Sequence, residues 1–133
     1  MNKLIPAYAA AAVLLVGLDL LWIGVIAKPL YQQGIGHLMA EKPSLTAAAL
    51  FYALYPAGLL VFAVVPHAVA PQPYRAALFG AVFGFFVYAT YDLTNLATLK
   101  NWPIGLSMID VAWGSAVSAA AAAAGGAAYR YLR

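Results

Sequence analysis

Three of the four acidic residues lie inside apolar segments of the sequence, where carboxyl groups are rare. Asp19, Asp92 and Asp110 are each flanked by runs of alanine, leucine, valine and aromatic residues. Ionisable residues in such segments are costly to bury and mark functional sites by default. Neighbouring carboxyl groups in a protein interior can carry out acid–base chemistry or hold a cation. These three residues are therefore the first candidates for a functional site.

The three aspartates share one depth along their segments. Each lies seven to nine residues from a polar boundary: Asp19 before Lys28, Asp92 before Lys100, and Asp110 after Pro103. At 1.5 Å per helical residue, each lies roughly 10–13 Å inside the same membrane surface. Exposure of all three charges to lipid would cost on the order of 8–10 kcal/mol. They must therefore face the protein interior or water, although one such aspartate could simply hydrogen-bond a neighbour and hold two helices together.

The composition indicates a membrane protein. Hydrophobic residues make up 65% of the 133 residues and charged residues 8%, whereas a soluble domain has about 25% charged residues. The net charge of +3 comes from seven basic and four acidic residues without a basic cluster, which argues against nucleic-acid binding. The absence of cysteine excludes disulfide scaffolds, thiolate metal sites and cysteine nucleophiles.

Four apolar segments are long enough to cross a bilayer, which takes about 20 helical residues. Backbone groups in hydrocarbon must be hydrogen-bonded internally, so each span should be helical. The first is read as a retained span, because it contains Asp19 and lacks a cleavage site. The predicted fold is all-α: one domain, 1–133, forming a compact bundle of four transmembrane helices with both termini on the same side. The spans are about 4–27, 44–65, 74–99 and 104–129, with a short interfacial helix within 29–41.

Helical periodicity assigns an inward face to three of the spans. On the third span this face is Gly80, Gly84, Tyr88, Tyr91, Asp92, Asn95 and Thr98. On the fourth span it is Ser107, Asp110, Gly114, Ser118, Ala121 and Gly125. On the first it is Tyr8, Ala12, Asp19 and Ile26, with Trp22 at its edge. Small residues at helical spacing let backbones approach closely in lipid, so Gly80, Gly84 and Gly114 are predicted at helix contacts.

The predicted site is a pocket in which the three carboxyl groups converge around Asp92. Its predicted ligand-binding residues are Asp19, Asp92, Asp110, Asn95, Tyr88, Tyr91, Trp22 and Trp113. Anchoring at the membrane interface is an alternative role for the two tryptophans. His37 and Glu41 are spaced to share a metal ion, but a solvated loop explains them as well, and no metal site is predicted.

Several blocks resemble one family of bacterial membrane proteins, catalogued as domain of unknown function 2177. They are Asp19-Leu20-Leu21-Trp22-Ile23-Gly24, Lys42-Pro43, Phe51-Tyr52, Tyr88-Ala89-Thr90-Tyr91-Asp92-Leu93-Thr94-Asn95-Leu96-Ala97-Thr98 and Asp110-Val111-Ala112-Trp113-Gly114. The resemblance covers essentially the whole chain. It implies a compact four-span protein of the bacterial inner membrane, and it implies no activity.

The functional prediction is a polar pocket open to one side of the membrane. The opposite halves of the spans are almost entirely apolar, which argues against a pore through a single chain. The expected partners are the lipid bilayer and a small cationic or lipid-like ligand, without nucleic acid or any indicated cofactor. Three other classes stay open: a carboxylate-dependent intramembrane enzyme, a proton- or cation-coupled transporter acting as a homo-oligomer, and a structural subunit of a membrane complex.

The distribution of basic residues predicts that both termini are cytoplasmic. Four basic residues lie on the side of the termini (Lys3, Arg75, Arg130 and Arg133), and three lie on the other (Lys28, Lys42 and Lys100). Basic residues are enriched on the cytoplasmic side of membrane proteins. Reporter fusions after Arg133 and within residues 32–38 should therefore report cytoplasm and exterior, respectively. A cytoplasmic signal from the 32–38 fusion would reverse the orientation.

Overall fold

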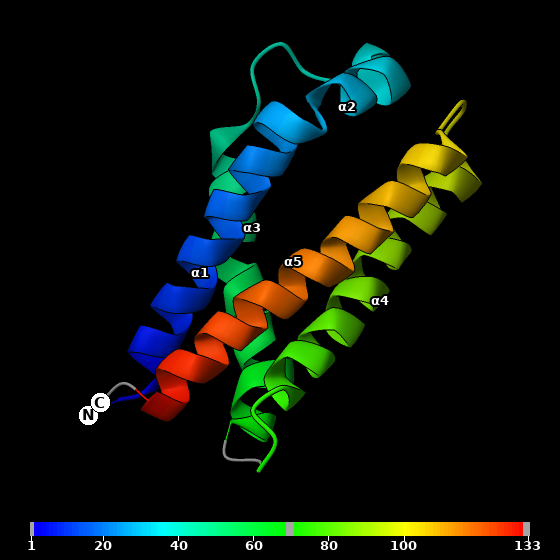
Figure 1. Cartoon of the computed structure of the whole chain (residues 1–133). Coiled ribbons are helices and arrows are strands. Elements are labelled where there is room, and N and C mark those ends of the chain that lie inside the picture. Colours follow the sequence, from blue (N-terminus) through cyan, green and yellow to red (C-terminus); the bar gives the residue numbers. More distant parts are fainter. Residues whose placement is uncertain (1, 69–70, 132–133) are drawn as a thin grey trace.

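The structure is a computed structural model that describes residues 2–68 and 71–131, and it consists of helices joined by short connections (Figure 1). The helices are α1 (Leu4–Leu21), α2 (Lys28–Ile35), α3 (Leu45–Leu59), α4 (Arg75–Thr98) and α5 (Ile104–Tyr131). Helix α1 continues into a π-helical turn, Trp22–Ile26, and α3 continues into another, Leu60–Val64. Single 3-10 turns follow at Gly36–Leu38 and Val65–His67.

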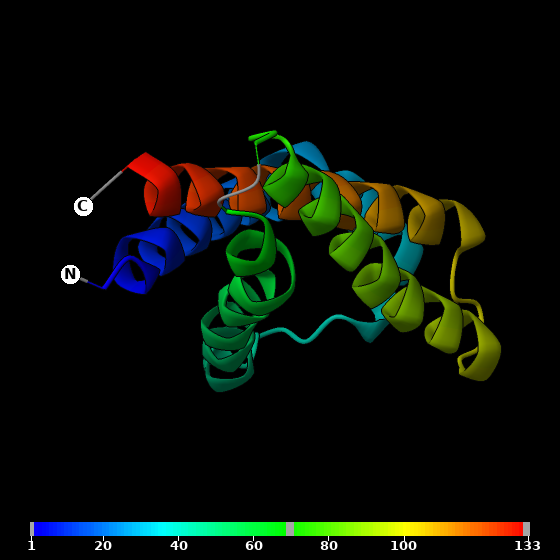
Figure 2. The ribbon, with the colours of Figure 1, turned by 90° about the horizontal axis from the view of Figure 1, so that it is seen from below.

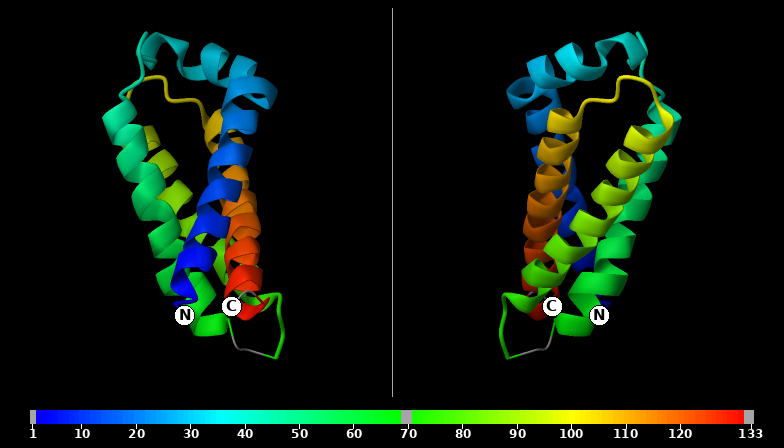
Figure 3. Two further views of the ribbon diagram at one scale, coloured as in Figure 1. Left: turned by 90° about the vertical axis from the view of Figure 1, so that its left-hand side faces the viewer. Right: turned by 90° about the vertical axis from the view of Figure 1, so that its right-hand side faces the viewer.

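Within the residues that the structure describes, four helical segments are long and apolar enough to cross a membrane: Leu4–Ile26, Leu45–His67, Arg75–Thr98 and Ile104–Tyr131. The predicted all-α class with four spans is thus confirmed. The Lys3 ammonium lies 5.6 Å from the centre of the Tyr129 ring. The start of α1 and the end of α5 therefore lie at the same end of the bundle, as Figure 3 shows.

Helices α4 and α5 form an antiparallel hairpin. The chain reverses at Asn101, whose φ of 60° lies in the left-handed region; asparagine adopts this region more readily than most residues. All six residues predicted to form the inward face of α5 are buried, from Ser107 to Gly125. On α4, the buried residues are Ala76, Gly80, Gly84 and Asp92, whereas the predicted Tyr91 and Thr98 are exposed.

Glycines set the distance between α4 and α5. A Cβ atom on Gly80 would lie 2.5 Å from the Ala122 Cβ and 2.7 Å from the Ser118 carbonyl oxygen. A Cβ atom on Gly84 would collide with the Gly114 carbonyl oxygen, and one on Gly114 would enter the Tyr88 ring. The prediction that these three glycines lie at helix contacts is confirmed, and they allow the backbone contact that drives packing in lipid.

Helix α1 packs against α5 through a face that differs from the predicted one. Its buried residues are Ala7, Ala11, Leu15 and Asp19. Tyr8 and Ala12 are half-buried, and Ile26 is 58% exposed. The prediction was wrong for Ile26 because the π-helical turn after Leu21 has more residues per turn than an α-helix, which rotates the following side chains off the inward face.

Helix α3 joins the core mainly through its second half. Leu59, Leu60, Ala63 and Val64 are buried, whereas the first half of α3 diverges from α4 (Figure 2). Pro56 lies inside this helix and cannot donate a backbone hydrogen bond. About two turns before the π-helical segment, the Tyr8 hydroxyl donates to the Ala53 carbonyl at 2.7 Å, which ties α3 to α1.

Helix α2 lies across the end of the bundle that is opposite the described termini (Figures 1 and 3). It contacts α5 at Gly34, where a Cβ atom would lie 3.0 Å from side-chain carbons of both Leu106 and Pro103. The glycine that interrupts the apolar pattern of this segment is therefore the residue that lets α2 approach α5. His37 and Glu41, which follow α2, are exposed.

Replacing Gly84 with leucine should destabilise the protein, because the new side chain would collide with backbone atoms of α5. Overpacking of this kind costs roughly 1–3 kcal/mol, so the melting temperature in detergent should fall by roughly 5 °C or more. Gly17→Leu is the matched control, because nothing lies within 4 Å of a Cβ atom on Gly17. Equal melting temperatures for the two variants would contradict the packing of α4 against α5.

Candidate functional site

The three aspartates are buried where α1, α4 and α5 approach the end covered by α2. Asp19 is 3% exposed, Asp92 is 2% exposed and Asp110 is 8% exposed. Each aspartate lies on the buried face of its helix, in line with the mostly small residues through which that helix contacts its neighbours. Asp19 and Asp92 both interact electrostatically with Asp110. Three carboxyl groups from distant parts of the sequence therefore influence one another in the interior.

Asp19 accepts hydrogen bonds from two other helices. The Tyr52 hydroxyl of α3 donates to its Oδ2 at 2.8 Å, and the Trp113 indole of α5 donates from Nε1 to its Oδ1 at 2.9 Å. Both oxygens of this carboxyl group are thus bonded, and α1, α3 and α5 are joined at one point. Hydrogen bonds of this kind satisfy a polar group that hydrocarbon could not solvate.

Two tryptophans separate Asp19 from Asp110. The Trp22 and Trp113 rings stack with their centres 4.5 Å apart and their planes 4° from parallel. Trp113 donates to Asp19, whereas Trp22 donates from Nε1 to the Tyr31 hydroxyl at 3.3 Å. The stack therefore connects the hydrogen bonds around Asp19 to those at α2.

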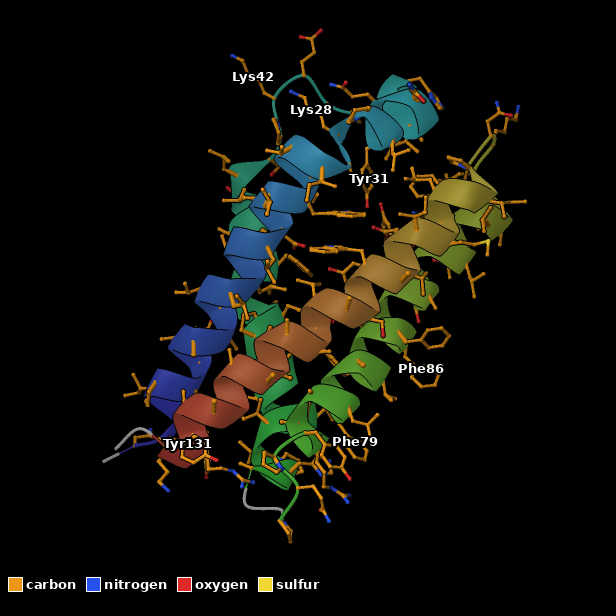
Figure 4. All side chains as sticks on the ribbon, in the orientation of Figure 1. Lys28, Tyr31, Lys42, Phe79, Phe86 and Tyr131 are labelled. Carbon is orange, nitrogen blue, oxygen red and sulfur yellow. The ribbon has the colours of Figure 1, made fainter. Side chains whose placement is uncertain are left out.

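Tyr31 of α2 completes this network. Its side chain points from α2 into the bundle (Figure 4), and its hydroxyl donates to the Asp110 Oδ1 at 2.5 Å. Burial, and then the hydrogen bond to Asp110, raise the pKa of Tyr31 above its ordinary value, so the phenol stays a proton donor at neutral pH. Tyr31 thus anchors α2 over the carboxyl groups.

Asp92 lies beside Asp110 and is less completely bonded. The two carboxyl groups interact directly, and the Trp102 indole lies nearby. The Oδ2 of Asp92 and the Nε1 of Trp102 are nevertheless both buried without a hydrogen-bond partner of good geometry. Native proteins leave few buried polar atoms unpaired, and each such atom requires an explanation. Asp92 therefore has capacity for a further partner at Oδ2.

The other predicted site residues lie around this cluster in different ways. Trp22 and Trp113 belong to the hydrogen-bond network. Tyr88 packs on Gly114 and meets the Tyr55 ring edge-on at 6.2 Å. Tyr91 is 52% exposed and meets the Trp102 ring edge-on, and Asn95 is half-buried beside it. The donors to Asp19 and Asp110 are Tyr31, Tyr52 and Trp113, so only Trp113 among the predicted residues donates to these carboxyl groups in the hydrogen bonds described above.

Tyr31 and Tyr52 were not predicted as site residues. Tyr52 lies eight residues after Ser44, the cap of α3, which places it at about 12 Å and thus near the depth of the aspartates. That signal could have identified it. No comparable signal exists for Tyr31, because its position depends on α2 folding back across the bundle.

The environment of the carboxyl groups contains no paired cation in the part of the chain that the structure describes. Within residues 2–68 and 71–131, no lysine or arginine side chain forms an ion pair with them, and the histidine and acidic side chains form no group arranged to hold a metal ion. Three neighbouring carboxylates cannot all be charged without compensation, so protons or a bound cation must balance them.

Sequence comparison identifies the family. The model of a family described as "Predicted membrane protein (DUF2177)" matches residues 4–127. The chain belongs to this family. The matched region contains the first three spans, the fourth span as far as residue 127, and all three aspartates. No curated protein and no solved structure matches the chain. The family is thus described by its membrane character, and an activity must be argued from the site itself.

Removing the Tyr31 hydroxyl should loosen α2 without unfolding the bundle. Tyr31→Phe leaves the Asp110 Oδ1 without its donor, which typically costs about 1–3 kcal/mol for a buried group. Amide hydrogen exchange should increase for residues 28–38 and stay unchanged in α4 and α5. Tyr74→Phe is the matched control, because Tyr74 is 63% exposed. Unchanged exchange at residues 28–38 would show that Tyr31 does not anchor α2.

Proposed function

We propose that the carboxyl cluster is a binding site for a small cationic or amphiphilic, lipid-like ligand. The observation that carries this proposal is the buried pair of carboxyl groups formed by Asp92 and Asp110. One oxygen of this pair, the Oδ2 of Asp92, has no hydrogen-bond partner. A ligand ammonium group would supply the missing donor and the missing positive charge together. Charge-assisted hydrogen bonds are roughly twice as strong as neutral ones.

The aromatic side chains around the carboxyl groups support a cationic ligand. Trp22, Trp113 and Tyr31 lie between Asp19 and Asp110. Aromatic ring faces attract ammonium groups, and the attraction is about 2 kcal/mol or more where water is excluded. An anionic ligand would be repelled by the neighbouring carboxyl groups wherever these are charged.

The opposite half of the bundle supports binding rather than conduction by a single chain. The core there consists of side chains such as Ala7, Ala11, Leu59, Val64 and Ala121, which are buried and apolar. An ion path would need polar lining along its full length. The polar residues gather at one end, which favours a site that is reached from one side.

Replacing Asp92 with asparagine should weaken binding of a small organic cation while preserving the fold. The amide keeps the shape of the side chain but removes its charge. Loss of a charge-assisted hydrogen bond worth about 1.5–3 kcal/mol should weaken binding by about tenfold or more. The probe is n-butylamine, titrated into the protein in phosphatidylcholine nanodiscs, and binding is followed by tryptophan fluorescence.

Glu41→Gln is the matched control, because Glu41 is the remaining acidic residue and is exposed. It should bind butylamine as the unmodified protein does. If Asp92→Asn bound butylamine equally well, or if the unmodified protein did not bind it, the proposal would be wrong. A purely structural role for Asp92 would instead lower the melting temperature without any saturable binding to lose.

A further inference from the structure

A groove runs along the outer face of the α4–α5 hairpin and reaches Asp92. It has a volume of about 770 Å³ and is lined by residues of both helices. Its alanines, among them Ala81, Ala89, Ala112 and Ala116, leave space between larger side chains. Among the larger residues that line it, Leu93 is 62% exposed and Met108 is 70% exposed. Because both helices are membrane spans, this groove faces lipid rather than water.

Asp92 is the ionisable residue among those that line this groove. The two serines that also line it are already bonded to backbone carbonyl groups. The Ser107 hydroxyl donates to the Pro103 carbonyl at 2.9 Å, and the Ser115 hydroxyl donates to the Ala81 carbonyl at 2.8 Å. The Asp92 side chain is 2% exposed and its Oδ2 has no partner. A cationic group in the groove would therefore have one carboxyl partner, at the position of Asp92.

The dimensions of the groove fit one alkyl chain. Ala81 lies eleven residues before Asp92 on α4, a distance of about 16 Å along the helix axis. This is about half of the hydrocarbon thickness of about 30 Å. The wall between these residues is apolar, with Phe85 and Ala89 on α4. A single chain of this length would be covered on one side by the protein and on the other by lipid.

We propose that the ligand is a membrane-borne primary amine with one alkyl chain, which enters sideways from the lipid. Its ammonium group donates to the Asp92 carboxylate, and its chain lies in the α4–α5 groove. A phosphate-bearing headgroup does not fit, because the groove lining contains a carboxyl group and no basic residue. This inference rests on the proposed function and adds the chemical class of the ligand and its route of entry.

The test compares two amines that share a headgroup. Binding of dodecylamine and n-butylamine is measured by equilibrium dialysis against the protein in phosphatidylcholine nanodiscs, with empty nanodiscs as background. Dodecylamine should bind at least about tenfold more tightly than butylamine, because its chain concentrates it in the bilayer beside the groove, whereas butylamine stays mainly in water. Dodecanol, which has the same chain without a charge, should bind at least about tenfold more weakly than dodecylamine.

Filling the groove should distinguish the contribution of the alkyl chain to binding from that of the ammonium group. Ala112→Phe and Ala116→Phe place a ring in the groove one helical turn apart, at exposed positions of α5. Both variants should weaken dodecylamine binding about tenfold and leave butylamine binding unchanged. Ala49→Phe is the matched control, since Ala49 is an exposed alanine of α3. A melting temperature close to that of the unmodified protein establishes that each variant is folded.

The outcomes distinguish this inference from the proposed function. If both amines bind with equal affinity, or if the groove-filling variants bind dodecylamine normally, the groove is not the site of the chain, although cation binding stands. If dodecanol binds as tightly as dodecylamine, the headgroup is not recognised by its charge and the inference fails. If neither amine binds in a manner that depends on Asp92, both proposals are wrong.

Discussion

The arrangement of this protein depends on the need to satisfy polar groups where no water can do so. A carboxyl group in hydrocarbon must find donors within the bundle or take up a proton. Asp19 meets this need with Tyr52 and Trp113, and Asp110 meets it with Tyr31. These contacts fix the rotation of α1 and α5 and bring α2 across the end of the bundle. The same constraint explains the side chains on the lipid face: Thr90, Thr94 and Thr98 each donate to a carbonyl group of their own helix four residues earlier.

Close backbone packing is what allows the carboxyl groups to meet. Transmembrane helices gain little from hydrophobic association, because lipid is as apolar as their side chains, so contact at small residues must hold them together. Gly80, Gly84 and Gly114 provide that contact between α4 and α5. Asp92 lies eight residues after Gly84 and Asp110 lies four residues before Gly114. The two carboxyl groups come together on the hairpin that these glycine contacts hold, and they interact. The glycine contacts and the acidic cluster are therefore two parts of one arrangement.

The sequence was informative where a helix keeps a regular repeat. On α5 the residues from Ser107 to Gly125 follow one α-helical repeat without interruption, and all six predicted inward residues are buried. On α1 the repeat breaks at the π-helical turn, which moved Ile26 to the outside. The depth of each aspartate follows from its distance to a polar boundary, but the partners of its carboxyl group do not. They depend on tertiary contacts such as the approach of α2 to α5 at Gly34, which no local pattern encodes.

The three aspartates differ in a way that separates structure from function. Asp19 has both oxygens bonded and joins three helices, which is the behaviour expected of a residue that holds a bundle together. Asp110 is bonded to the helix that covers the site. Asp92 keeps an unpaired oxygen although it is as deeply buried as the others, and it lines a groove that is open to lipid. A purely structural carboxyl group would gain stability from a further donor. A donor from outside the chain would supply what Asp92 lacks, which is the role that the proposed function gives to its ligand.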